Sequence, residues 1–95
     1  FTPRNPWRVV GAEADAKAAT VTGEFHLSRD LPAEAAHWPS DFRLTVAYRF
    51  TGTALAVDAH VENLGSDPLP FGLGYHGYFT VPGGPPDEPV DNLVL

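Results

Sequence analysis

The segment from Pro70 to Phe79, PFGLGYHGYF, places His76 in a run that contains no Asp, Glu, Lys or Arg. Histidine is the side chain whose ordinary pKa, about 6.5, lets it give and take protons near neutral pH. Glycines at positions 72, 74 and 77 remove side chains on both sides of it, so a ligand or another backbone can come close. His76 is therefore either a proton carrier in a site or a hydrogen-bonded core residue. The residues alone favour the core, because buried aromatic clusters are commoner than sites.

Aromatic residues close to His76 in the sequence supply flat surfaces. Tyr75, Tyr78 and Phe79 can pack on a sugar ring or build an aromatic core. Trp38, in the segment AHWP, can touch a ligand, although packing alone explains it equally well. Both interpretations stay open for these aromatic residues.

The remaining histidines give weaker signals. His26 and His60 fall on the polar sides of expected strands, which predicts that each faces solvent, and His37 precedes Trp38 in a loop. No two histidines have the close spacing of a metal site, and the acidic residues are scattered along the chain. We therefore expect no bound metal.

Charge and composition exclude several classes of function. Six basic against twelve acidic residues give a net charge of -6 with no basic cluster, so a nucleic-acid partner is not expected. The absence of cysteine excludes disulfides, thiolate zinc sites and cysteine nucleophiles. No apolar run has the length of a membrane span or of a signal-peptide core, so a membrane partner is not expected. The redox compartment stays open. The cytoplasm is the default localisation.

Alternation with a period of two predicts antiparallel strands. Between positions 42 and 50 the apolar or aromatic residues on one side are Phe42, Leu44, Val46, Tyr48 and Phe50. After the turn Thr51-Gly52-Thr53 the same alternation runs from Leu55 to Val61, which predicts a hairpin. Earlier strands are expected at Thr20 to Ser28 and at Trp7 to Val10, and a further extended segment at Leu69 to Val81. The alanine-rich stretches Ala12 to Ala19 and Pro32 to Ala36 are the only ones that favour a helix.

These elements predict an all-β fold, an antiparallel β-sandwich, in which residues 1–95 form part of one domain. Five strands in one sheet would expose an apolar face and two raw edges unless a second sheet covers them. The chain also starts at Phe1 without a methionine and stops on the apolar NLVL. We therefore expect a piece of a larger sandwich, and association of copies into a homo-oligomer through exposed sheet edges.

Three stretches taken in order resemble the aldose 1-epimerase (galactose mutarotase) family: VTGEFHL, WPSDFRLTVAYRFTGTALAVDAHVENLG and DPLPFGLGYHGYF. That family places a Trp-Pro pair before an aromatic-rich strand, an Asn at the end of the next strand, and a proline before a His-x-Tyr-Phe segment. The matching positions here are Trp38-Pro39, Asn63, Pro70 and His76 to Phe79. The resemblance covers Trp7 to Val81, and the His-x-Tyr-Phe segment is its most specific part.

The resemblance implies a large antiparallel β-sandwich that interconverts the anomers of a monosaccharide without a cofactor. A carboxylate takes the proton of the anomeric hydroxyl while a histidine protonates the ring oxygen, and the position of that histidine is His76. Tyr78, Arg4 and Trp38 are the candidate substrate-binding residues. In the hexose-6-phosphate branch an arginine stands where this sequence has Pro3, so the resemblance implies an unphosphorylated aldose.

Other catalytic groups of the family match no position in this sequence. They are the glutamate base, an aspartate that holds sugar hydroxyls and an earlier histidine. Residues 1–95 alone are therefore expected to be inactive. Two alternatives remain: a non-catalytic carbohydrate-binding β-sandwich that keeps the aromatic cleft, and a purely structural β-domain with His76 in its core.

Overall fold

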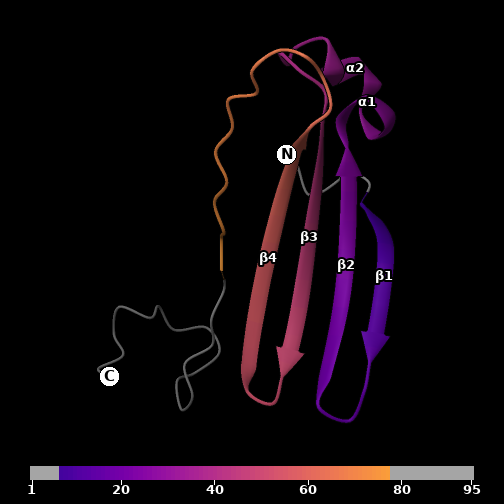
Figure 1. The fold of residues 1–95 in the computed structure, drawn as a ribbon, viewed down its shortest axis with the longest axis vertical. Coiled ribbons are helices and arrows are strands. Elements are labelled where there is room, and N and C mark those ends of the chain that lie inside the picture. The colour runs from indigo at the N-terminus through magenta and orange to yellow at the C-terminus, as the bar shows by residue number, and fades with distance from the viewer. Residues whose placement is uncertain (1–6, 78–95) are drawn as a thin grey trace, which may run out of the picture.

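A computed structural model describes residues 7–77 of the chain. Four strands form one antiparallel sheet in the order β1-β2-β3-β4, and two single-turn helices lie at one end of it (Figure 1). The elements are β1 (Arg8–Ala14), β2 (Ala18–His26), α1 (Leu27–Asp30), α2 (Pro32–Ala35), β3 (Phe42–Thr51) and β4 (Ala54–Asn63). The strands expected at 42–50 and 55–61 are confirmed, and the short stretch at Pro32 that favours a helix forms one. The strand expected at 20–28 is confirmed as far as His26, but Leu27 and Ser28 begin α1 instead. The strand expected at Trp7 extends further than predicted.

The β3–β4 hairpin follows directly from its sequence. Thr51 pairs with Ala54, which leaves Gly52 and Thr53 as a two-residue turn. Gly52 has a φ of 53°, a left-handed conformation that glycine adopts at little cost and that such tight hairpin turns require. The turn therefore fixes the register that sets Leu44 opposite Val61.

The alanine-rich stretch Ala12 to Ala19, whose composition favours a helix, instead forms the β1–β2 hairpin. Ala12 pairs with Val21 and Ala14 with Ala19. The Asp15 carboxylate accepts hydrogen bonds from the backbone N–H groups of Lys17 at 2.6 Å and Ala18 at 2.8 Å. Aspartate commonly forms such turns with its own backbone. A helix over these residues would have no apolar face to bury against a core, so strand pairing overrides the helical propensity of the alanines.

The core lies at the helical end of one sheet face. Phe25 and Leu27 have no exposed surface, and Phe42, Leu44 and Val46 are also buried. The Phe25 ring lies 6.0 Å from that of Trp7 and 6.1 Å from that of Phe42, which are ordinary distances for tilted aromatic pairs. The predicted alternation along β3 is therefore confirmed where the helices and the residues that follow β4 cover the sheet.

The same face is open at its other end. Val21, Tyr48, Phe50 and Leu55 continue the apolar side, yet each is at least 40% exposed. The structure is therefore mostly β with antiparallel strands, as predicted, but residues 7–77 form one open sheet rather than a sandwich. The two sheet edges are β1 and β4.

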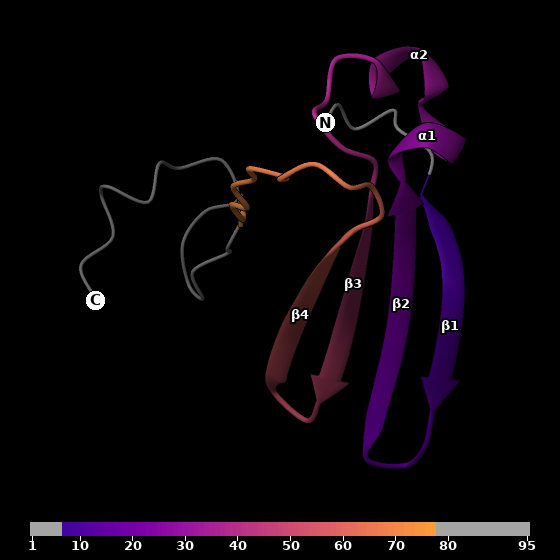
Figure 2. The same cartoon turned by 45° about the horizontal axis from the view of Figure 1, so that its top comes forward.

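Residues 64–77 follow β4 without forming a helix or strand. An extended segment was predicted from Leu69 to Val81; its described part, to residue 77, is coil, and the rest lies outside the described residues. Figures 1 and 2 both show this coil leaving the sheet at the end of β4 that is nearest the helices. Leu69 is half-buried and packs against the core cluster.

A pair of phenylalanine substitutions tests where the core lies. Phe25→Ala should lower the free energy of unfolding by about 3–5 kcal/mol, because it leaves a cavity among fully buried groups. Phe50→Ala, on the open part of the same face with 51% of the residue exposed, should cost less than about half as much. Urea unfolding of the full-length protein measures both. Equal losses would contradict a core confined to the helical end.

Candidate functional site

His76 lies on the exposed coil that follows β4, and the neighbouring Tyr75 is 63% exposed. A Cβ atom added at Gly72 or Gly74 would meet no atom within 4 Å, so the coil before His76 is open to approach. This exposure does not favour the interpretation of His76 as a core residue. It leaves its proposed catalytic role as a prediction.

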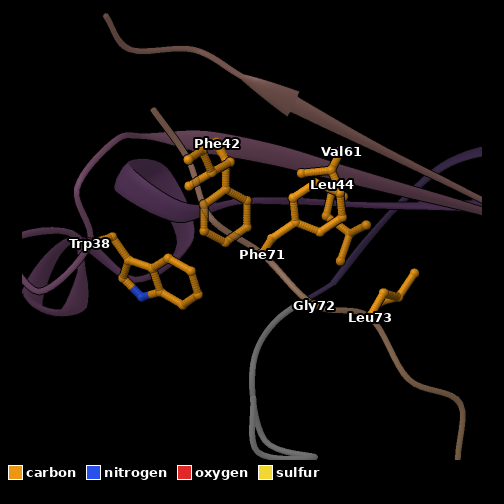
Figure 3. A pocket seen from close by; sticks show the side chains of 8 residues that line it. Trp38, Phe42, Leu44, Val61, Phe71, Gly72 and Leu73 are labelled. Carbon is orange, nitrogen blue, oxygen red and sulfur yellow. The ribbon is translucent and has the colours of Figure 1, made fainter. Parts of the chain in front are cut away.

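Trp38 is half-buried and packs edge-on against Phe42, with the ring centres 5.0 Å apart and the planes inclined by 60°. Its indole lines a small hollow between the sheet and the coil (Figure 3). The hollow measures about 90 Å³ and is lined by Trp38, Phe42, Leu44, Val61, Leu69, Phe71, Gly72 and Leu73. Figure 3 shows Phe71 and Leu73, which belong to the coil, reaching toward the side chains of the sheet.

The lining of this hollow decides what it can do. Its side chains are hydrocarbon apart from the indole nitrogen of Trp38. A sugar carries hydroxyl groups, and each hydroxyl that loses water without gaining a partner costs free energy. The hollow therefore joins the coil to the sheet through apolar contacts and offers at most an apolar wall to a sugar. Whether Trp38 binds substrate stays a prediction.

His26, Ser28 and Asp41 form a polar cluster beside α1 that sequence analysis missed. The Nε2 atom of His26 lies 2.8 Å from Oδ2 of Asp41, and the Ser28 hydroxyl donates to the same oxygen at 2.7 Å. The backbone N–H of Ser28 donates to the other oxygen of Asp41 at 3.0 Å. His26 was predicted only to face solvent, because nothing local in the sequence links it to an aspartate fifteen positions away.

These three residue types are those of a nucleophilic triad, but their geometry is different. In a triad the serine and the carboxylate contact opposite nitrogens of the imidazole ring. Here the Ser28 hydroxyl, at 3.2 Å, and the Asp41 carboxylate both lie at Nε2 of His26. The cluster therefore holds α1 against the start of β3 and lacks the arrangement for hydroxyl activation.

The environment of Asp41 stabilises its charged form. Burial raises the pKa of this carboxyl, but hydrogen bonds from the Ser28 hydroxyl, the His26 ring and the Ser28 N–H outweigh burial. Together with the charge of His26 they hold the pKa of Asp41 below its usual range.

The polar face of the sheet carries paired charges. Arg43 of β3 donates to Glu62 of β4 at 2.6 Å, and Arg29 of α1 donates to Glu24 of β2 at 2.8 Å. His60 is exposed, as predicted. Ion pairs this close to water contribute little stability each, so this face is a solvated surface.

Two predicted site residues, Arg4 and Tyr78, lie outside the described residues. Within residues 7–77, no group of three or more His, Cys, Asp or Glu side chains has an arrangement that could hold a metal ion. In the same range, no helix combines the length and apolar character needed to cross a membrane.

Comparison with known proteins adds one match. A family model described as Aldose 1-epimerase matches residues 1–93, which include all four strands and the coil that carries His76. No curated protein and no solved structure matches the chain. The match confirms the family predicted from the sequence motifs.

The lowered pKa of Asp41 predicts a dependence of stability on pH. Because this pKa is lower in the folded than in the unfolded chain, the contribution of Asp41 is complete above its unfolded value, about 3.9. It is lost as the pH falls through the folded value. Asp41→Asn should therefore flatten the fall in unfolding free energy below about pH 4, and Ser28→Ala should flatten it in part. Urea unfolding across this pH range gives the slope; a wild-type slope in Asp41→Asn would contradict the assignment.

Proposed function

The chain belongs to the aldose 1-epimerase family, and from this premise we propose that the full-length protein is a mutarotase with His76 as its general acid. The family is one of isomerases and implies a sugar substrate. The proposed reaction interconverts the α and β anomers of a free aldose such as glucose or galactose by opening and closing the ring.

The proposed chemistry needs one proton donor and one proton acceptor. A carboxylate removes the proton from the anomeric hydroxyl while His76 gives its proton to the ring oxygen, and the bond between the anomeric carbon and that oxygen breaks. The aldehyde then rotates, and the reverse transfers close the ring on either face. A histidine suits the acid role because its ordinary pKa lies near the working pH. Glu62 and Glu88 do not match the position of the family's base.

The location of His76 is the observation that best supports its assignment as the acid. His76 lies on an exposed coil inside the stretch that the family model matches, close to glycines with open space around them. A general acid must come within hydrogen-bond reach of the substrate oxygen. Gly74 and Gly77 allow a sugar ring to approach the imidazole without displacing a neighbouring side chain.

The proposal includes a second layer over the open apolar face. Tyr48, Phe50 and Leu55 expose apolar surface side by side on β3 and β4, and a sheet face of this kind is normally covered. A second sheet would turn the observed one into half of a β-sandwich. The edge strands β1 and β4 also favour association of copies, since an exposed edge can pair with another chain.

Replacement of His76 tests the proposed acid. His76→Asn in the full-length protein should lower the rate of mutarotation by about 10²- to 10⁴-fold, the usual contribution of a general acid. A polarimeter follows the approach of freshly dissolved α-glucose or α-galactose to its equilibrium rotation. His60→Asn, on the exposed polar face of β4, is the matched control and should keep the wild-type rate.

Two outcomes, one from polarimetry and one from an added fluorescence titration with sugar, would count against the proposal. A near-normal rate in His76→Asn would mean that His76 is not the acid. If the wild-type protein has no mutarotase activity but a sugar changes its tryptophan fluorescence, the carbohydrate-binding alternative is correct.

Residues 1–95 produced alone should not accelerate mutarotation, because no residue among them matches the family's glutamate base. Polarimetry at the same protein concentration as the full-length sample measures this against the buffer background. A rate above that background that disappears with His76→Asn would show that the chain contains its own base.

A further inference from the structure

Asn63, the last residue of β4, connects this strand to the segment before β3 and to the loop after β4. Its Oδ1 accepts a hydrogen bond from the Ser40 hydroxyl at 2.6 Å and another from the backbone N–H of Gly65 at 3.1 Å. Its Nδ2 donates to the carbonyl oxygen of Asp67 at 2.8 Å. One side chain therefore holds Ser40, two positions before β3, and two points of the loop that leaves β4.

The loop fits closely at this point. Ser40 is buried, with 7% of its surface exposed. A Cβ atom added at Gly65 would collide with the Ser40 hydroxyl oxygen and would lie 3.3 Å from Ser40 Cβ. The backbone N–H of Leu64 also donates to the Asp41 carbonyl at 2.8 Å. The direction in which the chain leaves β4 is therefore fixed by hydrogen bonds and by close contact.

The same coil is attached a second time further along. Leu69 packs against the core, and Phe71 and Leu73 line the apolar hollow with Trp38 and Val61. Phe71 and Leu73 nevertheless keep 63% and 48% of their surface exposed, so this attachment is partial. The hydrogen bonds of Asn63 therefore fix the direction of the coil at the point where it leaves β4.

We propose that Asn63 is a positioning residue for His76, acting through residues 64–75. This inference rests on the proposed function. Residues 64–77 form no helix or strand of their own, and within the described chain the apolar attachment at Phe71 and Leu73 is only partial. A change in the direction of the coil at Gly65 is therefore carried along it to the imidazole. A displacement of about 1 Å of a catalytic group can cost about 10²-fold in rate. Asn63 itself need not touch the sugar.

Two kinds of variant of the full-length enzyme test the proposal. Asn63→Ala removes all three hydrogen bonds, and Asn63→Asp keeps the acceptor for Ser40 and Gly65 but loses the donor to Asp67. Gly65→Ala disturbs the same contact by steric collision instead. Asp58→Ala, an exposed position of the same strand, is the matched control.

The expected result is a separation of kcat from KM. Asn63→Ala and Gly65→Ala should lower kcat about 10- to 100-fold with KM nearly unchanged, Asn63→Asp should lose less, and Asp58→Ala should match the wild type. Rates are measured per folded molecule, well below the melting temperature of each variant. A purely structural role would lower the melting temperature and leave kcat per folded molecule intact.

The outcomes separate this inference from the proposed function. If His76→Asn abolishes activity while Asn63→Asp and Gly65→Ala keep the wild-type kcat, the positioning role is wrong and the acid assignment stands. If His76→Asn keeps its activity, the acid assignment fails first, and the positioning role falls with it. Should Asn63→Ala fail to fold, Asn63→Asp and Gly65→Ala decide.

Discussion

The packing of Phe25, near the helical end of the inner strand β2, is the interaction on which the rest of the structure depends. Its ring contacts Trp7 and Phe42, and its strand partner is Leu44, so it joins the first three strands at the helical end. Burial of so large a side chain contributes about twice the net stability of a single hydrogen bond. The hydrogen bonds of Asp41 and Asn63 lie at this same end, where packing keeps their partners in place.

Local patterns in the sequence predicted the local structure well. Alternation in residues 42–61 gave the strands, and Gly52 gave the turn between them. The alanine-rich composition of Ala12 to Ala19 favoured a helix, but alanine's helical propensity is a small preference per residue, whereas strand pairing with Val21 depends on the whole sheet. A third extended segment was predicted from Leu69, but its described part, residues 69–77, forms no strand.

Some residues of the candidate site could be predicted from the sequence, and others could not. His76 and its glycines are visible in the sequence, and the family resemblance supplied its role. The contacts of Asn63 with Ser40 and of Asp41 with Ser28 join residues 23 and 13 positions apart, and no short motif marks either pair. Such contacts follow from strand register, so they could be found only after the sheet was known.

The arrangement has a consequence for how this fold would support catalysis. The sheet supplies rigidity, yet the proposed acid lies outside it, on a coil fixed by the amide of Asn63 and by partial apolar burial of Leu69. Loops positioned by a rigid scaffold commonly carry functional groups, because they can present a side chain without breaking strand pairing. The position of the His76 side chain then depends on the few contacts that hold the coil where it leaves β4. Asn63 can therefore affect the catalytic rate through the position of His76 without contacting the substrate.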